Sequence, residues 1–376
     1  MSAELIAVIA VIGAALAFDY TNGFHDAANA IATSVSTRAL TPRVALLIAA
    51  LGNFVGAHFG VKVANTVGDG LVILPTGLAS LGVVFAGVLG AIGWNLLTWY
   101  FGIPSSSSHA LFGGLVGATL LTPGGVVRWS NIVNKVILPM ALSPIVGFAL
   151  GAIFMFGMLW SIKGLTVLGR DRELPVAPEA PAGRLDRVRF RLRRRGILLG
   201  RWINASIQPG KLNRTFRRLQ TISATAMAVG HGMQDAAKTM GIVVLALYTG
   251  GLQESKTHIP GWVYYSSATV LALGTYAGGW RVIRTLGRRI IHLGPPEGFA
   301  AETVASSVLY YNSLVLGAPI STTHTITSAI MGVGATKKLS AVRWGVAGNI
   351  VLAWILTFPG AGVLAVIAYL LVRPLF

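Results

Sequence analysis

The sequence contains no cysteine and few charged residues. Only 11% of its 376 residues are charged, and just 12 of these are Asp or Glu. In an ordinary soluble domain about a quarter of the residues are charged, so this composition argues against a soluble globular protein. The absence of cysteine excludes disulfides, thiolate catalysis and cysteine-based metal sites.

The sequence is instead rich in long apolar segments. Hydrophobic residues make up 54% of the chain, and the mean hydropathy is +0.69. Several segments reach the roughly 20 residues that a membrane-spanning helix needs, and they are continuous, unlike the alternating strands of a membrane barrel. We therefore predict an all-α polytopic membrane protein that spans the lipid bilayer. The apolar stretch Leu5–Ala17 lacks a basic leader and is expected to be a span, not a signal peptide.

The net charge of +18 is concentrated in one segment. Between Lys163 and Arg218 there are fifteen Lys or Arg and four acids, which gives 15 − 4 = +11. Short loops on the cytoplasmic side of membrane proteins carry such an excess, and a basic run such as Arg187–Arg195 can also attract anionic lipid head groups. We predict a cytoplasmic linker and no binding of nucleic acid.

Two polar elements interrupt the apolar sequence and resemble each other. Pro104–His109 and Pro319–His324 each begin with proline and end in three hydroxyl residues followed by histidine, 215 positions apart. Further matches follow in the same order, between residues 23–29 and 232–238 and between residues 51–56 and 273–278. Matches in a constant order and at nearly constant spacing indicate an internal duplication.

The duplication divides the chain into three parts. We expect a first transmembrane repeat at 1–160, the basic linker at 161–218 and a second transmembrane repeat at 219–376. The polar elements lie around 103–110 and 318–325. Duplicated halves with interrupted hydrophobic segments at matching positions are typical of secondary transporters, whose substrate site lies between the repeats. The pattern alone leaves open whether the repeats are parallel or inverted.

Carboxylates at membrane depth are candidates for function, because burying them is costly unless an ion, water or a partner compensates. Asp26 and Asp235 are equivalent in the two repeats. Asn29 shares the helical face of Asp26, and together they suit a monovalent cation such as sodium, or a proton relay. The second repeat has Lys238 at the place of Asn29, so its copy is less suited to a bare cation. Glu302 is a further candidate for binding the coupling ion.

The serine-rich elements suit an anion. A half-helix that begins after Pro104 or Pro319 presents free backbone N–H groups and the positive end of its dipole. Hydroxyl groups add donors without charge, as a tetrahedral oxyanion requires. Back-bonding of the hydroxyls to the preceding turn is the structural alternative. The candidate binding residues are Ser105, Ser106, Ser107, Ser108, His109, Ser321, Thr322, Thr323 and His324.

Common motifs of enzymes are absent. The sequence has no GxxxxGK[ST] loop, no HExxH and no GxSxG elbow. We therefore predict that the protein is not an enzyme and uses no cofactor beyond a coupling proton or sodium ion.

The two polar motifs that contain the aspartates resemble a known family. Asp19–Ala30 and Gly230–Gly241 are similar to the two signatures of the inorganic phosphate transporter (PiT) family, and the serine elements resemble its hairpins. The resemblance implies two inverted-topology repeats with re-entrant helical hairpins, a central phosphate site and cation-coupled symport. It assigns Asp26, Asn29, Asp235 and Thr239 to the ion and phosphate site, and Ser105 to Ser108 and Ser321 to Thr323 to phosphate.

The coupling ion is the point on which the motifs depart from many members. His25 and Gln234 stand where many members have Asn before the signature aspartate, and the first motif is closer to the bacterial low-affinity, proton-coupled type. We therefore expect proton-coupled import of inorganic phosphate, either free or as a metal–phosphate complex. Sodium-coupled symport, with sodium at Asp26 and Asn29, and a sulfate permease are the alternatives. An anion channel and a non-transporting membrane scaffold are the alternatives from other classes, and homo-oligomerisation stays open.

Overall fold

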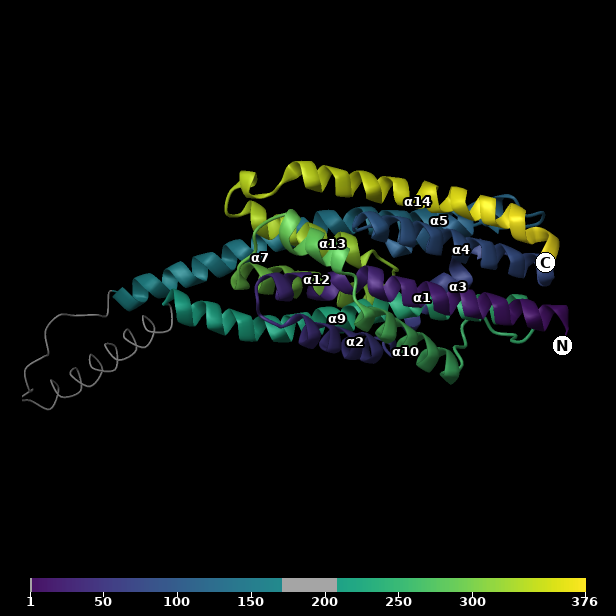
Figure 1. The fold of residues 1–376 in the computed structure, drawn as a ribbon, viewed down its shortest axis with the longest axis horizontal. Helices are drawn as coiled ribbons and strands as arrows, with labels where there is room; N and C mark the ends of the chain where they lie inside the picture. Colours follow the sequence, from purple (N-terminus) through teal and green to yellow (C-terminus); the bar gives the residue numbers. More distant parts are fainter. Residues whose placement is uncertain (1, 171–207) are drawn as a thin grey trace, which may run out of the picture.

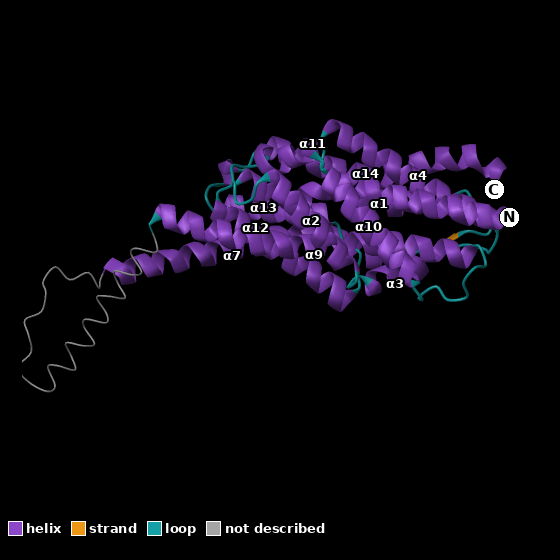
Figure 2. Ribbon diagram, turned by 60° about the horizontal axis from the view of Figure 1, so that its bottom comes forward, coloured by secondary structure: helices purple, strands orange, loops and turns teal. Residues whose placement is uncertain are grey.

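The computed structural model describes residues 2–170 and 208–376, and nearly all of them are helical (Figure 1). The helices lie roughly along one long axis (Figure 2). Two short strands, β1 (Val72–Ile73) and β2 (Val126–Val127), pair antiparallel with Val72 opposite Val127.

The elements follow the order of the two predicted repeats. The first half contains α1 (Ala3–Ser36), α2 (Pro42–Ala57), α3 (Val61–Gly70), α4 (Leu78–Phe101), α5 (Ser107–Leu120), α6 (Trp129–Asn131), the π-helical η1 (Ile132–Ile137) and α7 (Leu138–Arg170). The second half contains α9 (Pro209–Thr249), α10 (Gly261–Ala277), α11 (Trp280–Arg284), η2 (Thr285–Arg289), α12 (Pro295–Tyr310), η3 (Tyr311–Leu316), α13 (Thr322–Ala335), η4 (Leu339–Ala341), α14 (Trp344–Val372) and η5 (Arg373–Leu375).

The surface is apolar where a lipid bilayer would surround it. Among the described residues, four helical segments are long and apolar enough to cross a membrane: Ala3–Ser36, Leu78–Phe101, Trp129–Thr166 and Trp344–Leu375. α2 and α3 form a further pair, bent by 68°. Large apolar side chains point outward, whereas several carboxylates are buried inside. This arrangement suits a lipid solvent and confirms the prediction of an all-α, multi-pass membrane protein.

The two halves are packed into each other. α1 packs against α10 and α2 against α9, while α5 packs against α14 and α13 against α7. Asn53 even donates a hydrogen bond of 2.7 Å to Thr275, its counterpart in the other half. Equivalent helices therefore make equivalent contacts, as an internal duplication requires. The inverted orientation of the two repeats stays a prediction.

Each polar element is the turn of a helical hairpin. α4 and α5 pack against each other on either side of the first element, and α12 and α13 on either side of the second. Both turns begin with a glycine in the left-handed region, Gly102 at φ 65° and Gly317 at φ 61°. The other half binds each turn: Thr285 donates to the carbonyl of Gly102 at 2.8 Å, and Thr66 to that of Gly317 at 2.9 Å.

We expect Gly102→Ala to destabilise the protein. An L-residue in the left-handed region costs roughly 1–2 kcal/mol, and the new Cβ would lie 3.3 Å from Cβ of Arg281. Gly348→Ala is the matched control, because this helical glycine has open space around it and alanine favours a helix by about 0.5–1 kcal/mol. Thermal unfolding in detergent should show a lower Tm for Gly102→Ala and an equal or higher Tm for Gly348→Ala. Equal Tm values for Gly102→Ala and the unmodified protein would contradict the role of the turn.

The predicted linker at 161–218 lies mostly outside the described residues. Its first ten residues continue α7 to Arg170, and its last ten belong to α9, which begins at Pro209. Residues 171–207, including the basic run 187–195, fall in the part that the structure does not describe.

Candidate functional site

The two signature aspartates meet in the centre of the molecule. Asp26 lies in the second half of α1 and Asp235 in the second half of α9, and both are buried. One ligand atom from each of Asp26, His231 and Asp235 lies within 4.8 Å of the others. Three groups of this kind so close together form a candidate cation site. His231 was not among the residues predicted for the site.

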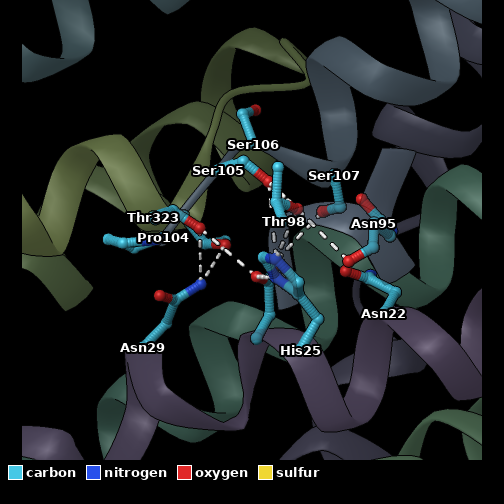
Figure 3. Close-up of polar contacts among 12 residues, drawn as sticks. Asn22, His25, Asn29, Asn95, Thr98, Pro104, Ser105, Ser106, Ser107 and Thr323 are labelled. Carbon is cyan, nitrogen blue, oxygen red and sulfur yellow. Dashed lines mark hydrogen bonds and ion pairs between the residues drawn. The ribbon is translucent and has the colours of Figure 1, made fainter. Parts of the chain in front are cut away.

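Asp26 contacts both hairpins. Ser107 Oγ, from the first hairpin, donates to Asp26 Oδ2 at 2.9 Å. Thr323 Oγ1, from the second, lies 3.4 Å from Asp26 Oδ1. Nδ1 of His25 is 2.7 Å from the same Oδ1, and Figure 3 shows the side chains of His25, Ser107 and Thr323 converging on this point. One carboxylate thus connects the two elements that were predicted to bind the substrate.

Asn29 adds a second link to the second hairpin. Its Nδ2 donates to Thr322 Oγ1 at 3.1 Å and to Thr323 Oγ1 at 2.9 Å (Figure 3). Its Oδ1 is buried and has no hydrogen-bond partner among the described residues. This oxygen has no donor from the protein among the described residues and is therefore available as a ligand.

The second repeat is built differently around its aspartate. Lys238 Nζ lies 2.7 Å from Asp235 Oδ1, and Nε2 of His231 lies 3.0 Å from Oδ2. Asn22 Nδ2 donates to Oδ2 at 3.2 Å. Lys238 also donates to the carbonyl of Ile320 at 3.3 Å. Asp235 thus accepts from two donors of the protein, Lys238 and Asn22, and the ring of His231 lies beside it.

Both hairpins present a helix N-terminus to this centre. Ser106 Oγ accepts from the backbone N–H of His109, and Ser321 Oγ from that of His324, each at 3.2 Å. These two serines, predicted as phosphate ligands, are therefore helix caps. A cap of this kind satisfies only one of the free N–H groups of the first turn. The remaining N–H groups and the helix dipoles make both ends favourable for an anion.

The other hydroxyls of the first element point in different directions. Ser105 Oγ lies 2.8 Å from Thr98 Oγ1, and Ser108 Oγ donates to the carbonyl of Ile320 at 3.2 Å. Only Ser107 of the four serines donates to a carboxylate of the centre. Figure 3 shows Ser106 pointing away from the group around His25.

His25 and Gln234, the departures from the family pattern, bind the hairpins at equivalent places. Nε2 of His25 is 3.1 Å from Thr98 Oγ1. Gln234 Nε2 donates to Ser313 Oγ at 2.9 Å, and its Oε1 accepts from the N–H of Ile320 at 3.0 Å. Thr98 and Ser313 are 215 positions apart, the spacing of the repeat. Sequence reasoning did not identify them, although the repeat spacing could have.

His109 and His324 lie against each other between the hairpins. Their ring centroids are 4.8 Å apart, and the ring of His324 lies 4.0 Å from that of Trp354. The indole of Trp354 donates to the carbonyl of Pro104 at 3.0 Å. The two histidines thus pack at the boundary of the hairpins, next to the predicted phosphate site.

Glu302 binds elsewhere in the structure. It accepts from Ser223 at 2.6 Å and from Gln220 at 3.3 Å, and it also accepts from Thr33. None of these three partners belongs to the cluster around Asp26 and Asp235. The structure therefore does not bring Glu302 together with the other candidates for the coupling ion.

Asp19 and Thr239 form a further buried pair. Asp19 lies beside Thr239, which was predicted for the phosphate site, and near Asp235 and Lys238. Both carboxylate oxygens of Asp19 lack a hydrogen-bond partner among the described residues. Asp19 begins the first signature motif but was not among the predicted site residues. Its setting makes it a member of the central cluster.

Comparison with known proteins finds relatives that match most of the chain. A model of the phosphate transporter family matches residues 22–365. A protein of Rhizobium meliloti (strain 1021), named "Probable low-affinity inorganic phosphate transporter", is 41% identical over 364 residues, which cover 96% of this chain and 95% of that protein. A protein of the same name from Bacillus subtilis (strain 168) is 38% identical over 377 residues, with 100% of both chains covered.

A solved structure is similar over the full length. It is titled "The sodium-dependent phosphate transporter" and matches with a TM-score of 0.80 and 24% identity, covering 99% of this chain and 100% of that one. At this identity the match shows the fold alone. The family model matches most of the chain, and both relatives are similar over nearly their full length. This chain therefore belongs to the phosphate transporter family.

Proposed function

We propose that the protein is a secondary active symporter that imports inorganic phosphate across the plasma membrane and couples this import to protons. The relatives are named as inorganic phosphate transporters. The observation that carries the proposal is the position of Asp26, which contacts a hydroxyl from each hairpin, Ser107 and Thr323. Substrate donors and a candidate ion-binding carboxylate are thus in direct contact.

Coupling follows from competition for the same donors. While Asp26 is ionised, its carboxylate occupies the hydroxyls of Ser107 and Thr323, and its charge repels phosphate. A proton on Asp26 removes the charge and weakens the hydrogen bonds that it accepts from these two hydroxyls. The two hydroxyls, together with the free N–H groups at the starts of α5 and α13, can then donate to the oxyanion. Proton and phosphate therefore bind together. Alternating access carries both to the other side.

Two features bear on the identity of the coupling ion. His25 lies 2.7 Å from Asp26 Oδ1, so its ring occupies a place that a sodium ion bound to this oxygen would need, and this favours the proton. The free Oδ1 of Asn29 supports the alternative, sodium between Asp26 and Asn29. The other expectations stay predictions: a metal–phosphate complex as substrate, no cofactor, no enzymatic activity and homo-oligomerisation.

We place the linker on the cytoplasmic side because basic residues also surround the helix ends next to it. Arg38 and Arg43 follow α1 and begin α2, and Lys337, Lys338 and Arg343 lie between α13 and α14. In Figure 1 these helix ends lie on the side where α7 ends and α9 begins. An excess of Lys and Arg marks the cytoplasmic side.

Uptake of labelled phosphate into proteoliposomes tests the proposal. We expect saturable uptake that accumulates phosphate against its gradient when a proton gradient is imposed, and weak competition by sulfate. Preferential uptake of sulfate would identify a sulfate permease. Flux that never exceeds equilibrium would indicate an anion channel, and no flux of either anion would favour a scaffold; each of these results would overturn the proposal.

A further inference from the structure

The two repeats differ at one position of their central sites. Asn29 follows Asp26 by three residues, and Lys238 follows Asp235 by three residues. Both pairs are buried in the second halves of equivalent helices, α1 and α9, which pack against each other. An amide in the first site is therefore replaced by an ammonium group in the second.

The ammonium group has the contacts of a bound cation. Lys238 is completely buried, and its Nζ lies 2.7 Å from Asp235 Oδ1. On its other side it donates to the carbonyl of Ile320 at 3.3 Å, in the turn of the second hairpin. A carboxylate from the signature helix and a carbonyl from the hairpin are oxygen ligands that also suit a monovalent ion.

The first site lacks such a built-in charge. Asn29 Nδ2 donates to Thr322 and Thr323, and Asn29 Oδ1 has no hydrogen-bond partner among the described residues. Asp26 receives hydrogen bonds but no contact from a lysine or arginine among the described residues. Its one ion-pair neighbour among the described residues is His25, which is charged only when protonated, whereas Asp235 contacts the ammonium group of Lys238. Asp26 can therefore be neutralised by a mobile cation, and Asp235 is already neutralised.

We infer that Lys238 is a tethered cation that permanently occupies the ion site of the second repeat, so that a mobile coupling cation binds only in the first repeat, at Asp26. The coupling part of this inference rests on the proposed symport. The occupied site keeps α9 attached to the second hairpin through Ile320 without an ion from solution. It also removes Asp235 from the groups that exchange a cation in each transport cycle.

Binding of cations to variants tests the inference without any transport assay. The Asp26→Asn variant removes the mobile site, and its Tm in detergent should not respond when choline is replaced by sodium, potassium, lithium or methylammonium. Adding Lys238→Ala vacates the second site and leaves Asp235 buried without its partner. The Tm of this double variant should fall, and at least one of these small cations should raise it again in a concentration-dependent way.

A third substitution separates the tethered charge from simple packing. In the triple variant Asp26→Asn, Asp235→Asn, Lys238→Ala the second site has no charge left, so small cations should no longer change the Tm. If the double variant requires a small cation to stay folded while the triple variant does not, that result also supports the inference. Failure of both variants to fold with any cation, or a double variant indifferent to all cations, would overturn it, as would a cation response of Asp26→Asn alone.

Phosphate uptake by proteoliposomes provides a second, independent test. In proteoliposomes, Lys238→Ala alone should lose about tenfold or more of its phosphate uptake in choline, because the site has lost its charge, and regain uptake with the cation that raises the Tm. If the unmodified protein transports no phosphate while the Tm results appear as expected, the proposed function fails and the tethered cation stands. Uptake by Lys238→Ala equal to that of the unmodified protein in choline would contradict the inference.

Discussion

Replacing Asp26 with asparagine is expected to abolish phosphate accumulation driven by an ion gradient while leaving the protein folded in the membrane. The amide keeps the shape of the carboxyl group and can still accept from Ser107 and Thr323, which now contact Asp26. It cannot bind a proton or attract a cation with a full charge. The variant should therefore behave as if residue 26 were always neutral. An ion gradient should then no longer drive the accumulation of phosphate.

The same variant should retain exchange of phosphate for phosphate. Counterflow needs the substrate site and alternating access but no net movement of the coupling ion. Proteoliposomes preloaded with phosphate should thus still take up labelled phosphate, whereas empty ones with an imposed gradient should not accumulate it. Glu254→Gln, the same change of acid to amide in an exposed loop, serves as the control and should behave as the unmodified protein. Normal gradient-driven uptake by Asp26→Asn would contradict the role of Asp26.

Removing the two hydroxyls that contact Asp26 should weaken phosphate binding strongly. In our account Ser107 and Thr323 turn from the carboxylate to the oxyanion when Asp26 is neutralised. A hydrogen bond to a charged group contributes about 1.5–3 kcal/mol, so Ser107→Ala or Thr323→Val should each raise the apparent KM roughly ten- to a hundredfold. The KM for phosphate in the uptake assay measures this effect directly.

The matched controls are hydroxyls that bond only within their own helix. Thr225 donates to the carbonyl of Thr221 at 2.9 Å, and Ser307 to that of Thr303 at 2.8 Å. Thr225→Val and Ser307→Ala should leave the KM within a factor of about two, since surface substitutions usually change free energies by less than 0.5 kcal/mol. A KM for Ser107→Ala or Thr323→Val as low as that of these controls would contradict the assignment.

Much of the centre could be predicted from the sequence because the duplication repeats it. Asp26 and Asp235 were recognised as equivalent carboxylates, and they do lie together where α1 and α9 pack. The two proline–hydroxyl–histidine elements were recognised as a pair, and they form the turns of two hairpins. A constraint that appears twice at constant spacing is a stronger signal than either copy alone.

Which hydroxyl of each element caps a helix and which one contacts the centre could not be predicted. Ser106 and Ser321 are caps because α5 and α13 begin at Ser107 and Thr322, and a shift of one residue would exchange their roles with those of their neighbours. The contact between Lys238 and Ile320 depends on how a hairpin from one part of the repeat packs on a helix from another. Asp19 likewise joined the cluster only through the packing of α1 against α9. Such contacts depend on the tertiary arrangement and leave no local pattern.

The most direct test of proton coupling compares two ion gradients in proteoliposomes that contain the unmodified protein. One set receives an inward proton gradient without sodium, and the other an inward sodium gradient at equal pH on both sides. We predict that labelled phosphate rises above its equilibrium level only in the first set, and that a protonophore abolishes this accumulation. Accumulation driven by the sodium gradient alone would contradict proton coupling at Asp26.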